Sequence, residues 1–235
     1  MSTTSPPVVT VDGPAGSGKT TLGRRLAAAL HLPLIDTGLL YRGVTVAAVR
    51  AGVDASDPER AAHLAAHTDI EVNTDPLAAP GDWSVRVDGA DATGESRDPR
   101  NATLLAQLSQ IPEVRAVLLG RQRDMAIHGA VAVGRDCGTV VFPHAPVKFF
   151  LVASPHVRAE RRAEQLRQAG TTVDAAQLEA EIAGRDALDT QRAVSPLRPA
   201  ADAHIIDTGS EGIDAMVDEA MQVCREAGLA AARRE

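Results

Sequence analysis

Residues 8–30 constrain the fold of this 235-residue chain more than any other stretch of the sequence. Residues 8–12 alternate between β-branched and small polar side chains, as a short strand does. Residues 13–20 then match G-x-x-x-x-G-K-[ST], in which glycines let several backbone N–H groups converge on one point. The segment that follows carries three leucines at helical spacing. A strand, a glycine loop and a helix in this order predict a phosphate-binding loop at the N-terminus of the helix.

The loop also supplies side chains that suit a nucleotide with a metal ion. Lys19 would reach the β- and γ-phosphates, and the hydroxyl of Thr20 would bind Mg²⁺. The alternative is a chance match in a glycine-rich turn, which the flanking strand and helix disfavour. The residues expected to hold ATP are Gly13, Pro14, Ala15, Gly16, Ser17, Gly18, Lys19, Thr20 and Thr21.

Composition argues against several classes of partner. The formal charge is −7, and only one Trp, one Tyr and three Phe are present, which disfavours a duplex-binding surface and a base-stacking platform. Two cysteines are too few for a disulfide framework or a zinc cluster, so we expect reduced thiols. The sequence lacks a long apolar run, and its start lacks the apolar region of a signal peptide. We therefore expect a cytoplasmic protein that binds neither nucleic acid nor membrane.

Strands alternate with helices along most of the chain, which predicts an α/β fold with a parallel sheet. In such sheets ligands bind at the carboxyl ends of the strands, where the loop, Asp36-Thr37 and Gly134-Arg135-Asp136 all fall. The expected strands are residues 8–12, 31–36, 130–133, 147–152 and 203–207. The expected helices after the first are residues 43–50, 57–67, 101–110, 112–127, 155–168, 174–186 and 213–227.

Residues 68–100 differ in character from the rest of the chain. Residues 69–73 and 84–88 alternate as strands do, and Asp88-Gly89 is typical of a tight hairpin turn. We interpret this stretch as a small β-rich insertion and not as a separate domain. It is either a plain solvent-facing hairpin or a part of substrate handling.

Arginines recur at strand ends and helix starts, and on shared helix faces. They are Arg42, Arg115, Arg135, Arg158, Arg161, Arg162, Arg185 and Arg192. Arginine grips phosphate bidentately, so several arginines around a phosphate-binding loop suit phosphoryl transfer to a second phosphorylated substrate. For the group at residues 158–162, the alternative is a solvated helix face with Glu160 and Glu164 as partners.

Four carboxylates accompany these arginines in the sequence. Asp36, Asp136, Asp186 and Asp189 can each hold a base edge, a ribose hydroxyl or a water on Mg²⁺. Each can instead cap a helix or pair with a neighbouring arginine. Asp189 follows Arg185 at a spacing of four residues and fits such an ion pair, with Arg192 on the same face if the segment is helical.

The chain resembles the bacterial cytidylate kinases, the nucleoside monophosphate kinases that phosphorylate CMP with ATP. The matching motifs run in order from about residue 8 to residue 207 and cover most of the chain. They are Asp12–Thr20, Asp36–Arg42, Ile111–Arg115, Gly134–Pro143, Ala145–Lys148, Arg185-Asp186, Asp189, Arg192 and Ser195–Leu197. The loop alone would indicate only an NTPase, whereas the ordered set is specific to this family.

The resemblance implies a single P-loop NTPase domain, with three α/β/α layers around a five-stranded parallel sheet. It implies a CORE of residues 8–65, 99–155 and 170–228, a β-rich NMP-binding insertion of residues 66–98 and a short LID of residues 156–169. It also implies a monomer that converts CMP or dCMP to the diphosphate, with ATP and Mg²⁺ and by reversible transfer.

The implied catalytic residues are Lys19, Arg135, Arg158 and Arg162. Those in the LID would close over the transferring group and exclude water. The implied acceptor-binding residues are Thr37, Tyr41, Arg42, Arg115, Arg135, Asp136, Arg185, Asp189 and Arg192. Among them, Arg115 and Asp136 would read the cytosine edge, because cytosine offers an amine donor to a carboxylate and acceptors to an arginine. Arg42, Arg135 and Arg192 would hold the CMP phosphate, and Arg185 and Asp189 would lie near the ribose.

Two positions depart from the family pattern. Ala106 stands where the family commonly has a serine that touches the base, and Val133 where it commonly has an acidic residue. Loss of the hydroxyl would weaken base recognition by about 0.5–1.5 kcal/mol, unless Ser109 partly replaces it. Two alternatives therefore stand beside CMP: a kinase for a modified cytidine or other pyrimidine monophosphate, and a catalytically weak ATP-binding regulatory protein. The acceptor arginines argue against the second.

Overall fold

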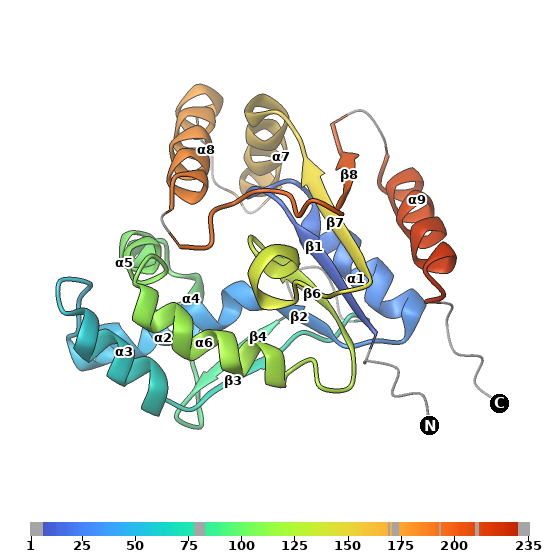
Figure 1. Ribbon diagram of the computed structural model, residues 1–235. Helices are drawn as coiled ribbons and strands as arrows, with labels where there is room; N and C mark the ends of the chain where they lie inside the picture. The colour runs from blue at the N-terminus through green and yellow to red at the C-terminus, as the bar shows by residue number, and fades with distance from the viewer. Residues whose placement is uncertain are drawn as a thin grey trace, which may run out of the picture. The chain divides into compact units, whose positions relative to one another are not determined.

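The computed structural model describes residues 7–77, 83–168, 170, 174–192, 194–209 and 212–229. Two compact units divide the chain (Figure 1). The first unit contains Pro33–Ala130, and the second contains Pro7–Leu32 with Val131–Glu235. Within the described ranges, every helix is too short or too polar to cross a membrane.

The larger sheet has five strands in the order β2-β6-β1-β7-β8. In chain order they are β1 (Val8–Asp12), β2 (Leu34–Asp36), β6 (Ala130–Gly134), β7 (Val147–Val152) and β8 (His204–Asp207). β1 pairs in parallel with β7, with Val9 beside Val147 and Asp12 beside Phe150, and β7 pairs in parallel with β8. The predicted α/β fold with a five-stranded parallel sheet is confirmed.

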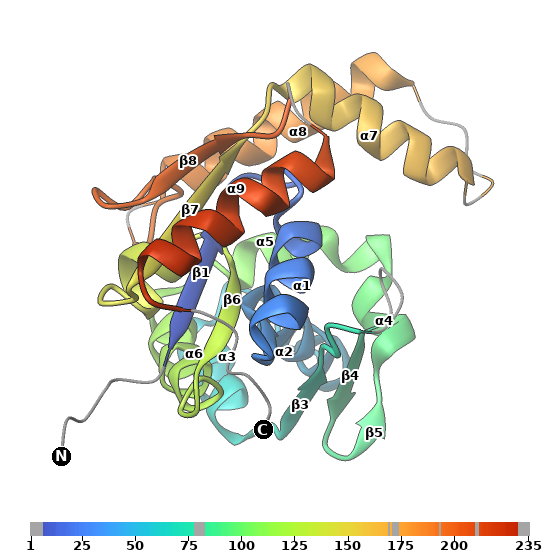
Figure 2. The same ribbon diagram turned by 90° about the vertical axis from the view of Figure 1, so that its right-hand side faces the viewer.

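In the second unit, β1 is buried along its whole length, as a central strand covered on both faces should be. α1 (Lys19–Leu30) contacts β1 and α9 (Ile213–Glu226) contacts β7, and these two helices pack side by side (Figure 2). α7 (Pro155–Gln168) and α8 (Ala175–Thr190) form a second pair (Figure 1). A π-helical turn, η2 (Cys137–Val141), follows β6 and contacts β1.

The first unit contains several helices and a small antiparallel sheet of β3 (Ile70–Asn73), β4 (Ser84–Val87) and β5 (Ala90–Asp91). The helices are α2 (Thr37–Ala51), α3 (Pro58–His67), α4 (Thr93–Arg97), α5 (Ala102–Leu108) and α6 (Pro112–Asp124), with a 3₁₀ turn at Pro99–Asn101. α2 contributes to two apolar clusters. Val44 packs in one with Leu118 of α6, and Val46 packs in the other with Val85 of β4.

The predicted hairpin at Asp88-Gly89 joins β4 to β5. Both residues have positive φ, 51° for Asp88 and 74° for Gly89, which is the backbone of the two-residue turns that match strand twist. The prediction of a β-rich stretch between residues 68 and 100 therefore holds for the residues described in it.

Three local features differ from the sequence expectations. α2 begins at Thr37 and not near residue 43, because the Asp36 side chain accepts a hydrogen bond from the Gly38 N–H at 3.0 Å and caps the helix. α8 extends to Thr190, so that Arg192 lies beyond its end. The stretch after Asp136, in which the sequence predicts no helix, forms the π-helical turn η2.

Candidate active site

The loop between β1 and α1 has the backbone that its glycines predict. Gly13 has a φ of +147°, and a Cβ there would lie 2.4 Å from the Leu151 carbonyl oxygen, so only glycine fits. Gly18 precedes α1 with a left-handed φ of 91°. Among the described residues, no side chain caps the first turn of α1, and that turn contains no acidic residue. This helix N-terminus can therefore bind an anion.

Ser17 is a second feature of the loop that suits an anion. The residue is fully buried, and its hydroxyl has no hydrogen-bond partner within the described part of the chain. A buried hydroxyl normally has a partner, so this one fits a site that a phosphate oxygen would complete.

Three consecutive carbonyl groups of the loop each accept a hydrogen bond from a cationic side chain. Nη1 of Arg135 donates to Gly13 at 3.1 Å, and Nη1 of Arg158 donates to Ala15 at 3.1 Å. Between them, Nζ of Lys19 donates to the carbonyl of Pro14 at 2.6 Å. Three predicted catalytic residues thus contact the loop in the second unit.

Arg158 is held from several sides. It is only 2% exposed, and its Nη2 donates to Oδ2 of Asp186 on α8 at 2.5 Å. Its Nε donates to the carbonyl of Ala153 at 3.0 Å. The other carboxylate oxygen of Asp186 is buried and has no hydrogen-bond partner in the described residues. In this conformation the guanidinium of Arg158 braces the loop.

Asp189 gathers two of the arginines predicted to bind the acceptor phosphate. Its Oδ2 accepts from Nε of Arg135 at 2.6 Å, and its Oδ1 accepts from Nη2 of Arg192. The carboxylate is 3% exposed, whereas Arg135 and Arg192 keep 18% and 11% of their side chains exposed. Arg185, on the same helix, is exposed. Asp189 therefore pairs with both arginines and holds their positive charges close together.

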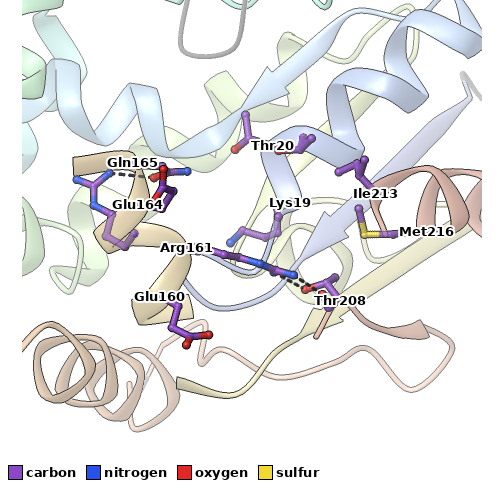
Figure 3. Close-up of a pocket in the computed structure, with 13 residues that line it drawn as sticks. Lys19, Thr20, Glu160, Arg161, Glu164, Gln165, Thr208, Ile213 and Met216 are labelled. Atoms are coloured by element: carbon purple, nitrogen blue, oxygen red, sulfur yellow. Dashed lines mark hydrogen bonds between the residues drawn. The ribbon is translucent and has the colours of Figure 1, made fainter. Parts of the chain in front are cut away.

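A pocket of about 680 Å³ adjoins the loop in the second unit (Figure 3). Thr20 and Thr21 line it from α1, Arg162 lines it from α7, and Ile213 and Met216 supply an apolar wall from α9. Its mixed polar and apolar lining suits the nucleoside part of a nucleotide whose phosphates lie on the loop.

Thr208 connects this pocket to the loop and was not among the residues predicted from the sequence. Its hydroxyl donates to the Ser17 carbonyl at 3.1 Å. It also accepts from Nη1 of Arg161 at 3.0 Å (Figure 3). Its position directly after β8, at the carboxyl end of a strand, was the signal that could have found it.

Asp12 was also missed as a functional candidate, although it precedes the loop. Its carboxylate accepts hydrogen bonds from the backbone N–H groups of Cys137 and Gly138, at 2.8 and 2.7 Å. Burial raises the pKa of Asp12 from 3.8 to about 6, against the opposing effect of these hydrogen bonds. Asp136, the predicted base reader, lies next to this contact and is also buried.

The remaining predicted acceptor residues lie in the first unit. Thr37 is buried at the start of α2, and one turn later the Tyr41 ring lies 5.4 Å from the guanidinium carbon of Arg115. Nη1 of Arg115 also donates to the Ser109 carbonyl at 3.0 Å. Tyr41 and Arg115 are therefore neighbours, from α2 and α6.

Arg42 contacts a different part of the first unit. Its Nη1 donates to the Ser96 carbonyl at 2.6 Å, near the end of α4. Its guanidinium carbon lies 5.9 Å from the ring of Trp83, the single tryptophan of the chain, and that of Arg97 lies 4.3 Å from the same ring. Trp83 and Ser96 were not singled out from the sequence, because neither belongs to a motif.

The structure shows what surrounds Ala106 and Val133, the two residues that depart from the family pattern. Ala106 lies on α5, and its carbonyl accepts a hydrogen bond from the Ser109 hydroxyl at 2.9 Å. Val133 is fully enclosed in β6, where all but the last residue are buried. An apolar side chain suits that place on packing grounds.

Comparison with known proteins agrees with these features. The family model described as cytidylate kinase matches residues 9–226. A cytidylate kinase of Pelotomaculum thermopropionicum is 45% identical over 97% of this chain and 98% of its own. One of Escherichia fergusonii is 42% identical over 94% of this chain and 96% of its own.

A solved structure of an uncharacterized protein from Eubacterium ventriosum shares the fold. It has a TM-score of 0.52 and 14% identity, and the alignment covers 94% of this chain and 98% of that one. The family match and the two relatives span almost the whole sequence, including both units. The chain belongs to the cytidylate kinase family.

Proposed function

We propose that this protein transfers the γ-phosphoryl group of ATP to CMP and dCMP. One observation carries the proposal: the second unit contains both a glycine loop and a pair of arginines, Arg135 and Arg192, that share the buried carboxylate of Asp189. A protein that only binds ATP has no need for a second cluster of phosphate-binding arginines, whereas a kinase with a phosphorylated acceptor does.

For the donor, we propose that ATP places its phosphates on residues 13–21 and its nucleoside in the adjoining pocket. The residues present fit such a ligand, because Ser17 offers a buried hydroxyl and the N-terminus of α1 offers N–H groups. Lys19 would exchange the Pro14 carbonyl for phosphate oxygens. Mg²⁺, bound by the hydroxyl of Thr20, would neutralise charge on the phosphates.

For the acceptor, we propose that CMP is bound by the residues that the family resemblance implies. Arg42, Arg135 and Arg192 would hold its phosphate, and Arg185 and Asp189 would contact its ribose. Arg115 and Asp136 would read the cytosine edge. In the first unit, Thr37 and Tyr41 complete the set, and the contact between Tyr41 and Arg115 supports a shared role for them.

The chemistry needs no covalent intermediate and no general base. An ionised oxygen of the acceptor phosphate attacks the γ-phosphorus. The bond from the γ-phosphorus to the oxygen that bridges the β- and γ-phosphates breaks, and ADP leaves. Arg162, which lines the pocket from α7, would neutralise the transferring group. Arg158 can join it only by leaving Ala15 and Asp186, so a movement of α7 is part of this proposal. The proposal also includes a monomeric enzyme in the cytoplasm, a reducing compartment in which the two free thiols would persist.

A steady-state assay tests the proposal. MgATP is offered with CMP, dCMP, UMP, AMP and 5-substituted CMPs, and ADP and each diphosphate are measured. We expect CMP and dCMP to be the best acceptors, and a Lys19→Met variant to lose at least about 100-fold in kcat. Turnover restricted to a substituted pyrimidine would move the assignment to a specialised kinase. ATP binding without any diphosphate product would overturn it.

A further inference from the structure

Asp12 joins two segments that are far apart in the sequence. It is the last residue of β1 and directly precedes the phosphate-binding loop. Its two carboxylate oxygens accept from the N–H groups of Cys137 and Gly138, the first two residues of η2. These N–H groups begin a helical turn and have no partner within it, so Asp12 caps η2 from a neighbouring strand.

The contact is close on both sides. A Cβ at Gly138 would lie 3.3 Å from Oδ2 of Asp12 and 2.8 Å from Oγ1 of Thr10, so a side chain there would push β1 and η2 apart. A second hydrogen bond lies beside the contact of Asp12 with η2: Arg135 donates to the carbonyl of Gly13 at 3.1 Å. Residues 12 and 13 thus fasten the start of the loop to the turn of residues 135–138.

The charge on Asp12 carries an energetic cost. The residue is 3% exposed, and burial disfavours its ionised form, with the neighbouring carboxylate of Asp136 adding to that effect. An uncharged side chain would avoid this cost. Only a carboxylate, however, presents two acceptor oxygens to two adjacent N–H donors.

We propose that Asp12 is a positioning residue for the acceptor site. It holds the segment that carries Arg135 and Asp136 in a fixed relation to the phosphate-binding loop. The proposal rests on the proposed function in one respect, the assignment of Arg135 and Asp136 to CMP. Because misplacement by about 1 Å can cost a large factor in rate, a cap of this kind would be felt in catalysis although Asp12 touches no substrate.

Hydrogen–deuterium exchange tests the contact without any substrate. In Asp12→Asn, one carboxylate oxygen is replaced by an NH₂ group that faces an N–H, so we expect residues 137–141 to exchange about tenfold faster or more. Thr10→Val is the matched control, because Thr10 lies on the same strand, is equally buried, and has a hydroxyl without a partner in the described residues. Unchanged exchange in Asp12→Asn would overturn the proposal.

Steady-state kinetics then separate positioning from general damage. We expect KM for CMP to rise about tenfold or more in Asp12→Asn, with KM for ATP changed by less than about threefold. Thr10→Val should leave both unchanged. An unchanged KM for CMP in Asp12→Asn would overturn the proposal, because a smaller folded fraction lowers kcat without changing KM. Should the wild-type protein make no CDP, the proposed function fails, while the exchange experiment still decides the role of Asp12.

A pH profile supplies a third readout. Besides Asp136, the ionisable groups around Asp12 are the Cys137 thiol, Arg135, which is paired with Asp189, and Lys148, whose Nζ binds Asp202 at 2.8 Å. As pH falls through about 6, Asp12 takes up a proton and can no longer accept from both N–H groups.

The CMP phosphate also titrates near about 6, so the comparison must be made between proteins. In a plot of log kcat/KM against pH, we expect the acid side of the wild-type profile to have the slope of two groups that take up a proton. The profile of Asp12→Asn should have the slope of one such group. Profiles of equal steepness would overturn the proposal.

Discussion

Nε of Arg135 donates a hydrogen bond to Oδ2 of Asp189 at 2.6 Å, although 54 residues separate them in the chain. The carboxylate is 3% exposed and also holds Arg192. One buried negative charge therefore supports two guanidinium groups. The shared carboxylate offsets the repulsion between the two guanidinium groups, so that they can stay close enough together to bind one phosphate.

Replacement of Asp189 by asparagine should destabilise the protein as well as weaken CMP binding. The change leaves two arginines in a largely buried place without a counter-charge, and we expect the free energy of unfolding to fall by about 3 kcal/mol. Urea unfolding measures this. Asp214→Asn is the control, because its ion pair with Arg25 is exposed, and it should cost less than about 1 kcal/mol. Equal losses in the two variants would contradict the role given to Asp189.

Gly13 should tolerate no side chain. In Gly13→Ala the new Cβ would meet the Leu151 carbonyl oxygen at 2.4 Å, so we expect a loss of about 2 kcal/mol in stability and of most ATP affinity. Gly184→Ala serves as the control, since this glycine lies inside α8 and a Cβ added there would meet no atom outside the backbone of its own helix within 4 Å. It should stabilise the protein by about 0.5–1 kcal/mol. Thermal unfolding compares the two, and a stable Gly13→Ala variant would be the contrary result.

The cysteines should be inert in the folded protein. Burial raises the pKa of the Cys224 thiol from 9.0 to about 11, and Cys137 is fully buried in η2. We expect Ellman's reagent at a pH of about 8 to find almost no reactive thiol in the native state and both thiols in guanidinium chloride. Rapid reaction of one thiol before unfolding would show that its segment opens locally.

His156 should link α7 to α8 in a pH-dependent way. A hydrogen bond from the ring to Glu179, with the nearby charge of Glu160, raises the pKa of His156 above 6.5. Its contribution to stability is therefore fully present below about 6.5 and is lost as pH rises through the raised value.

An NMR titration of His156 tests this assignment. We expect Glu179→Gln to lower its pKa more than Glu160→Gln does, because the hydrogen bond to Glu179 is the largest cause of the shift. The opposite order would show that the ring faces α7 alone.

The sequence predicted the features that depend on neighbours in the chain. The loop, the Asp88-Gly89 turn and the alternation of strands with helices all rest on local patterns, and the structure contains them. α2 begins earlier than predicted, because the Asp36 side chain caps it at Gly38, one of the roles that the sequence leaves open for this residue.

The features that the sequence could not predict depend on contacts across long separations. Asp12 meets residues that follow it by 125 positions, and Thr208 reaches the Ser17 carbonyl across 191 positions. η2 could not be expected from its own sequence, because the groups that cap it belong to β1. Arg158 is predicted to close over the transferring group, whereas its burial against Asp186 is visible only once α7 and α8 are paired.

The three cations on the carbonyls of Gly13, Pro14 and Ala15 also act on the other ends of the peptide groups. A carbonyl oxygen that accepts a hydrogen bond from a cation withdraws electron density from its peptide nitrogen, and the attached N–H becomes a stronger donor. The peptide groups of Pro14 and Ala15 end in the N–H of Ala15 and of Gly16. Before a nucleotide binds, Arg158 and Lys19 therefore polarise the loop through its own backbone. Two amides that carry no charge themselves become stronger donors for an incoming phosphate.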